Sequence, residues 1–203
     1  MGDLPRRFLE QIFYKRREFI ENVIKGNIND RDFAIVATRH NPAFATYGPA
    51  GLNVSVKGVG FVVKEEFLEE TIEKLKEAAF MKENAVERLK TLLELVYNEE
   101  RIDFSKLITL ELAKKHTWKN LKDDGGAVTL LYFIPPDIAF EVRCKAEVHL
   151  NGPYFEYANI IHDFYHAPHK VGKRCFPTYV LTIKEIYDNS VDSFGKKIYP
   201  KSD

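Results

Sequence analysis

The sequence predicts an α+β protein, mainly antiparallel β, in which a small barrel or curled sheet carries flanking helices. Residues 140–150 alternate apolar and polar side chains with a period of two, as in a strand with one face in a core and one in solvent. The strand-like segments are short and joined by hairpin-length connections, which favours an antiparallel arrangement over alternating βαβ units. Two amphipathic stretches, 5–25 and 67–97, have the apolar spacing of helices.

The N-terminal part is expected to begin with a helix over residues 5–25. Pro5 suits a first helical turn, and apolar residues recur at spacings near three and four up to Gly26, which favours a stop. Residues 33–38 are a short apolar run of strand length, and residues 44–47 are expected to return antiparallel to it. The chain is therefore expected to open with one helix and a pair of strands.

Glycines and a change of periodicity mark the middle of the chain. Gly-Pro-Ala-Gly at 48–51 is interpreted as a turn, because it lacks the Lys-Ser/Thr of a phosphate-binding loop and the spacing of a dinucleotide fingerprint. Residues 52–63 are rich in valine and glycine, which predicts one bent strand or a hairpin. Residues 67–97 are expected to form a long helix or helical hairpin, inserted between the β-rich parts.

The second half contains most of the expected sheet. Residues 128–134 are a continuous apolar run stopped by two prolines, as in a buried strand. The other elements expected here are strands at 105–112, 140–150 and, as the last strand, 178–187, with helical segments at 117–122 and 154–164. A single domain over 1–203, with the barrel at about 33–187, is expected because 203 residues supply one core of ordinary size.

Composition and charge argue against several classes of protein. The 30 basic side chains balance 30 acidic ones, which disfavours a general binder of nucleic acid or acidic membranes. The longest apolar runs, such as 128–136, are far short of the roughly 20 residues that span a bilayer. The amphipathic N-terminus lacks signal-peptide features, and only Cys144 and Cys175 occur as cysteines. A soluble, cytoplasmic protein without nucleic-acid or membrane partners is expected.

Histidines gather near residues 162–169. His162 and His166 have the i, i+4 spacing at which two imidazoles on a helix reach one ion, and Asp163 or His169 would supply a third ligand. However, no glutamate follows His162 as in a zinc-protease helix, and Pro168 interrupts the geometry. A partly exposed loop is therefore favoured over a metal site.

A basic cluster at 114–120 has two interpretations of equal weight. It follows an expected strand and opens a helical turn, where free backbone N–H groups and cationic side chains favour a phosphate. It is equally consistent with a solvated basic turn in which Trp118, the only tryptophan, is a hydrophobic anchor.

The order of motifs after this point is distinctive. A strand leads into a basic turn ending in Asn-Leu, followed by an aliphatic strand, a strand with an Ala-Glu pair and a closing strand; these motifs are 107–112, 115–121, 128–133, 142–148 and 179–187. In this order the chain resembles, over roughly 104–190, the pyridoxamine-5'-phosphate-oxidase-like, FMN-binding split-barrel family. The first half departs from that family's compact form through the 48–51 turn and the helical insertion near 67–97.

The resemblance implies a split β-barrel, FMN as the cofactor and a homodimer with the cofactor between the subunits. The residues that it assigns to the cofactor are Lys115, His116 and Thr117 facing the phosphate, Trp118 and Asn120 supporting the turn, and Thr46 and Tyr47 approaching the ring. No catalytic side chain is implied, because the redox chemistry belongs to the flavin.

The leading functional hypothesis is an FMN-binding oxidoreductase or flavin carrier acting on an unknown small molecule. A second hypothesis keeps the barrel but replaces FMN with haem or a deazaflavin; the candidate axial ligands are then His40, His116, His149 and the histidines of 162–169. A third is a non-catalytic binding or assembly protein that uses the N-terminal helix and residues 67–97 as a partner surface. A metal-dependent hydrolase built on His162, His166 and His169 is the fourth.

Overall fold

The computed structural model describes residues 4–80, 85–166 and 175–200. Its strands pair antiparallel throughout, in the order β2-β1-β5-β6-β7-β4-β3, with β8 also paired to β7. The strands are β1 (Ala43–Thr46), β2 (Asn53–Val56), β3 (Gly60–Val63), β4 (Ile102–Leu110), β5 (Gly126–Ile134), β6 (Ile138–His149), β7 (Thr178–Asp188) and β8 (Lys196–Tyr199). The predicted fold class, α+β and mainly antiparallel with flanking helices, is confirmed.

The sheet curls, and its two edge strands are consecutive in the chain. β2 pairs with β1 and β3 pairs with β4, so the link between them carries the chain from one edge of the sheet to the other. Within this link Val59 N donates to the His40 carbonyl at 2.9 Å, and Thr109 Oγ1 donates to the Gly58 carbonyl at 2.7 Å. Residues 52–63, predicted as one bent strand or a hairpin, are instead two short strands, β2 and β3, that lie at opposite edges of the sheet and do not pair with each other. Among the described residues no ladder joins the two edges.

The first helical segment matches its prediction. α1 (Arg6–Leu9) continues through a π-helical turn, η1 (Glu10–Tyr14), into α2 (Lys15–Lys25), and Gly26 ends it with a left-handed φ of 73°. Phe8 packs edge-on against the rings of Tyr132 and Phe140, with ring centroids 6.2 and 5.4 Å apart. The helix therefore contributes directly to the core of the sheet.

The expected strand at 33–38 is wrong, because these residues belong to α3 (Asp30–His40). A capping box starts this helix: the Asn29 side chain accepts from Asp32 N at 3.2 Å, and the Asp32 carboxylate accepts from Asn29 N at 3.0 Å. The expected pairing of residues 44–47 with that strand is wrong as well, since β1 pairs with β2 and β5.

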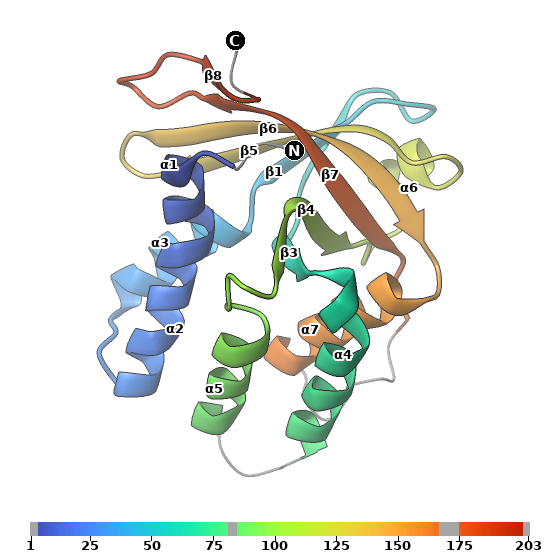
Figure 1. Cartoon of the computed structure of the whole chain (residues 1–203). Helices are drawn as coiled ribbons and strands as arrows, with labels where there is room; N and C mark the ends of the chain where they lie inside the picture. Colours follow the sequence, from blue (N-terminus) through green and yellow to red (C-terminus); the bar gives the residue numbers. More distant parts are fainter. Residues whose placement is uncertain (1–3, 81–84, 167–174, 201–203) are drawn as a thin grey trace.

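The remaining helices agree with the sequence. The expected insertion at 67–97 is a helical hairpin of α4 (Glu65–Phe80) and α5 (Ala85–Leu95), and the later helical segments are α6 (His116–Leu121) and α7 (Pro153–His166). In Figure 1, helices α1 to α5 and α7 lie below the curled sheet, while α6 lies at its right-hand end. None of the described helices combines the length and apolar composition needed to cross a membrane.

The strictly alternating segment is strand β6, and it behaves as predicted over most of its length. Phe140, Val142, Cys144 and Ala146 are buried, whereas Leu150 lies beyond the strand and is exposed. β7 is not the last strand, as had been expected, because β8 follows it and pairs with it.

Candidate functional site

A cavity of about 440 Å³ lies where the β2–β3 segment passes the end of β4. This volume falls within the range of small-molecule sites, roughly 300–1,000 Å³. Its walls come from the β2–β3 segment, β4 and the loop after it, the start of α6, the end of α3, the turn after α5, and one face each of η1–α2 and α7. Three parts of the lining are distinguished below by name. The α6 end is formed around Thr117, the Lys57 pair is Lys57 with Glu111, and the Arg16 end is formed around Arg16.

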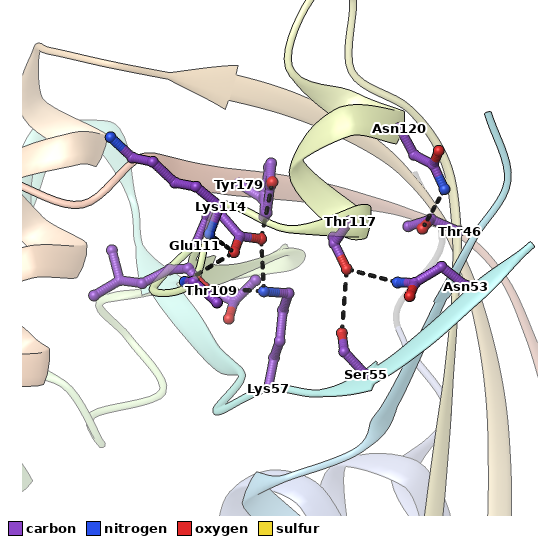
Figure 2. Close-up of polar contacts among 12 residues, drawn as sticks. Thr46, Asn53, Ser55, Lys57, Thr109, Glu111, Lys114, Thr117, Asn120 and Tyr179 are labelled. Carbon is purple, nitrogen blue, oxygen red and sulfur yellow. Dashed lines mark hydrogen bonds and ion pairs between the residues drawn. The ribbon is translucent and has the colours of Figure 1, made fainter. Parts of the chain in front are cut away.

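The α6 end gathers hydroxyl, amide and cationic side chains. The buried Thr117 Oγ1 accepts from Asn53 Nδ2 at 2.9 Å and lies 3.3 Å from Ser55 Oγ, as Figure 2 shows. Lys115 and His116 also line the cavity here, both exposed, and neither side chain has an ion pair or hydrogen bond within the described part of the chain. This end therefore offers an unengaged lysine and an unengaged histidine beside small polar donors.

The Lys57 pair occupies the middle of the wall (Figure 2). Lys57 Nζ lies 2.9 Å from Glu111 Oε2, and their side chains are only 10% and 2% exposed. Burial opposes ionisation of the Glu111 carboxyl, but the hydrogen bond and charge of Lys57 and the N–H groups of Lys114 and Ala113 outweigh it and lower its pKa. Tyr179 also donates to Glu111 at 3.2 Å, and burial together with that carboxylate raises the phenol pKa far above its usual value. The charge of Lys57 is thus neutralised within the protein.

The Arg16 end lies among helices. The guanidinium of Arg16 donates through Nη1 to the Val59 carbonyl at 3.1 Å and through Nη2 to Tyr97 Oη at 2.9 Å. Tyr165 Oη donates to Tyr97 Oη at 3.3 Å. His40 also faces this space; burial, and then the nearby Arg16 charge, lower its pKa to about 3, so its imidazole is neutral at ordinary pH.

The predicted histidine cluster lies partly in the cavity. His162 and His166 line it with ring centroids 4.9 Å apart, and His162 Nδ1 is 3.2 Å from Asp163 Oδ1. His169 lies outside the described residues. Within the described ranges, no group of three or more His, Cys, Asp or Glu side chains is arranged to hold a metal ion.

The seven residues assigned by resemblance divide into three groups. Lys115, His116 and Thr117 line the cavity. Asn120 and Thr46 are joined beside it, with Asn120 Nδ2 donating to Thr46 Oγ1 at 3.1 Å. The other two lie apart from the lining: Trp118 is partly buried against the core, and Tyr47 is 79% exposed.

Asn120 organises the glycine-containing turn that precedes β2. Its Oδ1 accepts from Ala50 N at 2.7 Å, and its Nδ2 donates to the Gly51 carbonyl at 2.9 Å. Gly48 is in close contact with Asn120, since a Cβ at position 48 would lie 3.1 Å from its backbone. Residues 48–51 thus form the predicted turn, held by a side chain 70 positions away in the sequence.

Sequence reasoning missed Arg16, Lys57, Glu111 and Tyr97 as lining residues. For Arg16 a signal exists, because it follows Phe13 by three positions and precedes Ile20 by four, which places a basic residue on the apolar face of the helix. For the Lys57–Glu111 pair no local signal exists, because the two residues are 54 positions apart.

No protein-family model and no curated protein sequence matches the chain. Similar solved structures include HupZ from Group A Streptococcus, with 13% identity, coverage of 84% of this chain and 98% of that chain, and a TM-score of 0.48. An FMN-binding protein from Syntrophomonas wolfei subsp. wolfei has 12% identity, coverage of 92% and 94%, and a TM-score of 0.46. A pyridoxinephosphate oxidase family protein from Clostridium acetobutylicum has 9% identity, coverage of 85% and 90%, and a TM-score of 0.43. At these values the likeness concerns the general arrangement of the chain alone.

Proposed function

We propose that the chain is a flavin-binding protein that holds FMN in the 440 Å³ cavity, with the phosphate at the α6 end. The observation that carries this proposal is that one end of the cavity is polar and the rest of its wall is mostly apolar. One lysine and one histidine side chain without protein partners meet a group of small polar donors at the α6 end, while most of the remaining wall is apolar or aromatic.

The donor set at the α6 end fits a phosphate. Lys115 supplies positive charge and His116 an imidazole hydrogen-bonding group at the surface, where a phosphate keeps part of its hydration. Ser55, Asn53 and Thr117 supply neutral hydrogen-bonding groups deeper in. Bound FMN would supply redox chemistry, and the chain's part would be to hold the phosphate and shield the ring. The proposed role is an oxidoreductase or flavin carrier acting on a small molecule.

The test compares FMN with riboflavin, which lacks the phosphate. Wild-type protein is expected to bind FMN at least about tenfold more tightly than riboflavin, measured by quenching of flavin fluorescence. The double variant Lys115→Ala/His116→Ala should lose that preference while still binding riboflavin. Lys119→Ala, which removes an exposed basic residue of α6 outside the cavity, should retain it. Absence of FMN binding, or an unchanged preference in the double variant, would refute the proposal.

Haem is a second candidate because four of the six histidines, His40, His116, His162 and His166, line the cavity. Nδ1 of His40 is buried and has no hydrogen-bond partner within the described residues, and its low pKa keeps the imidazole in the neutral form that ligates iron. Added haem would then give a Soret band that His40→Ala abolishes and that His149→Ala, outside the cavity, preserves. A Soret band insensitive to His40→Ala would count against this candidate.

We further propose a homodimer through the outer face of the β2–β1–β5 edge. Val54 and Val56 on β2 and Leu131 and Phe133 on β5 are exposed, and Val56 and Leu131 flank Ala43 in the same pairing row. A second copy of the chain would cover this apolar surface. Light scattering should give a dimer mass that Val54→Lys lowers, because Val54 lies on this face and outside the cavity lining. Val191→Lys, at an exposed valine beyond β7, should leave the mass unchanged, and a monomeric wild type would exclude the dimer.

A further inference from the structure

Two buried cations line the same cavity, but only one of them has a counter-charge. Lys57 is paired with Glu111 at 2.9 Å. Arg16 is 7% exposed, and no carboxylate lies within 4.0 Å of it in the described ranges of the chain. A buried charge without a partner is costly, so proteins usually satisfy such a group with a carboxylate or a bound ligand.

The hydrogen bonds of Arg16 leave much of its donor capacity unused. A guanidinium has five N–H groups, of which one reaches the Val59 carbonyl and one reaches Tyr97 Oη. Tyr97 Oη also accepts from Tyr165, and its own proton has no acceptor among the described side chains. Three guanidinium N–H groups and the Tyr97 phenolic O–H therefore have no hydrogen-bond partner within the described residues.

Besides burial, the positive charge of Arg16 helps to lower the pKa of the neighbouring His40. His40 is held neutral first by burial and then by the charge of Arg16, so it adds no second positive charge. One guanidinium balances one negative charge, which matches a carboxylate better than a phosphate dianion. Its planar fork also matches the two oxygens of a carboxylate.

The surroundings of Arg16 indicate what carries that carboxylate. Tyr97 stacks on Phe13 with ring centroids 5.9 Å apart, and Phe61 meets Phe13 edge-on at 5.9 Å. Tyr157 and Ile161 of α7 complete this part of the cavity lining. Aromatic and aliphatic walls of this kind suit a flat apolar body such as an aromatic ring.

We propose that the Arg16 end is a binding subsite for an aromatic carboxylate, in which Arg16 and Tyr97 hold the carboxylate and the aromatic wall holds the ring. The subsite is separate from the α6 end. Ser55, beside Thr117, and Val59, beside Arg16, are four residues apart in the β2–β3 segment, and Lys57, paired with Glu111, lies between them in the sequence. The inference goes beyond the proposed FMN site and does not depend on it.

The test uses 4-fluorobenzoate as the probe, observed through its fluorine NMR signal with the full-length protein and without flavin. Wild-type protein is expected to bind 4-fluorobenzoate, and to bind the neutral 4-fluorobenzamide about tenfold or more weakly. Arg16→Met should weaken 4-fluorobenzoate binding about tenfold to a hundredfold. The matched control is Arg17→Met on the same helix, because Arg17 pairs with Glu21 and lies outside the cavity lining.

Several results would overturn the proposal. One is that the wild type does not bind 4-fluorobenzoate, and another is that Arg16→Met binds it as tightly as the wild type does. A third is that Lys115→Ala/His116→Ala loses the binding instead, which would place the carboxylate at the α6 end. Should Arg16→Met fail to fold, Tyr97→Phe removes only the hydroxyl that contacts Arg16 and should still weaken binding several-fold; unchanged binding would overturn the proposal. Failure of FMN to bind has no effect on this titration, so the two proposals fail separately.

Discussion

Replacing Glu111 with glutamine is expected to destabilise the fold by about 3 kcal/mol. The Glu111 carboxylate is 2% exposed and accepts four hydrogen bonds, from Lys57 Nζ, Tyr179 Oη and the backbone N–H groups of Ala113 and Lys114. Glutamine has nearly the same shape, so packing changes little. What the variant removes is the charge that balances Lys57 and, because an amide NH2 only donates, the oxygen that accepts from Lys57 Nζ and Tyr179 Oη.

The magnitude follows from the surroundings of Lys57. Removing one partner of a buried ion pair costs about 3–5 kcal/mol, because the other charge stays buried without compensation. Two features place Glu111→Gln near the lower limit. The amide oxygen of glutamine still accepts hydrogen bonds from the backbone, and Lys57 Nζ remains 5.7 Å from the ring centroids of both Phe44 and Tyr179, each such contact contributing about 0.5–1 kcal/mol.

A double-variant cycle with Lys57→Met, followed by urea unfolding, isolates the pair. The destabilisation of Lys57→Met/Glu111→Gln is expected to fall short of the sum of the single variants by about 2 kcal/mol. The exposed pair Lys76–Glu73 on α4 is the control, with an expected coupling below about 0.5 kcal/mol. Additive effects at Lys57 and Glu111 would refute the assignment of a coupled buried pair.

The same pair gives the stability a defined response to acid. The folded pKa of Glu111 lies below its ordinary value of 4.5, so the unfolded chain takes up a proton first as the pH falls. The contribution of the ionised carboxylate is therefore complete above about pH 4.5 and is lost as the pH falls through the folded pKa. The stability difference between wild type and Glu111→Gln should narrow below pH 4.5, and a constant difference would contradict the lowered pKa.

Three further predictions concern single residues. The folded pKa of His40 is about 3, against an ordinary 6.5, so the unfolded state binds the proton first as the pH falls. The free energy of unfolding of the wild type should therefore fall by about 1.4 kcal/mol per pH unit below pH 6.5. His40→Gln should lack this pH dependence when unfolding is measured in urea. Burial raises the pKa of Cys144 to about 12, while Cys175 is exposed. A thiol reagent should therefore modify one cysteine in native protein and two after unfolding. Rapid modification of two cysteines in native protein would contradict the burial of Cys144. Asn120→Ala should cost about 2 kcal/mol through loss of its bonds to Thr46 and the 48–51 turn, and a change under 0.5 kcal/mol would show that these bonds are not structural.

The error at residues 33–38 shows how little a short apolar run says about its conformation. The run Phe-Ala-Ile-Val-Ala-Thr contains β-branched residues and is short enough for a strand. The deciding signal lies just before it, where Asn29 and Asp32 have the spacing of a capping box. No α3 residue is fully buried, although Ile35 is partly buried against the core, so the start signal carries much of the local explanation.

Strand β8 was missed for a different reason. Its four residues, Lys196–Tyr199, carry too few apolar side chains for any periodicity to be detected. Its place is set by the preceding turn, where Gly195 adopts a left-handed φ of 83° and donates to the Asp188 carbonyl at 2.8 Å. By contrast, β6 was predicted because its 12 residues offered a long alternation between core and solvent.

The candidate site was predictable only where its residues are contiguous. Lys115, His116 and Thr117 are adjacent, so the sequence itself places them together, and they do meet in the cavity. For Lys57 no local pattern shows which residue it pairs with, and for Arg16 the apolar helix face predicts burial but not the absence of a carboxylate. The difference arises when the curl of the sheet brings residue 57 to Glu111 and leaves Arg16 without a carboxylate.

This distribution of charge divides the cavity into two ends that act independently. Lys57, paired with Glu111, lies between Ser55 and Val59 in the sequence, and sites without shared partners usually contribute additively. Arg16→Met should therefore leave the preference for FMN over riboflavin unchanged, and Lys115→Ala/His116→Ala should leave 4-fluorobenzoate binding unchanged. If each variant impaired both measurements, the two ends would have to be one site, because only a shared ligand position or a common loss of structure would couple them.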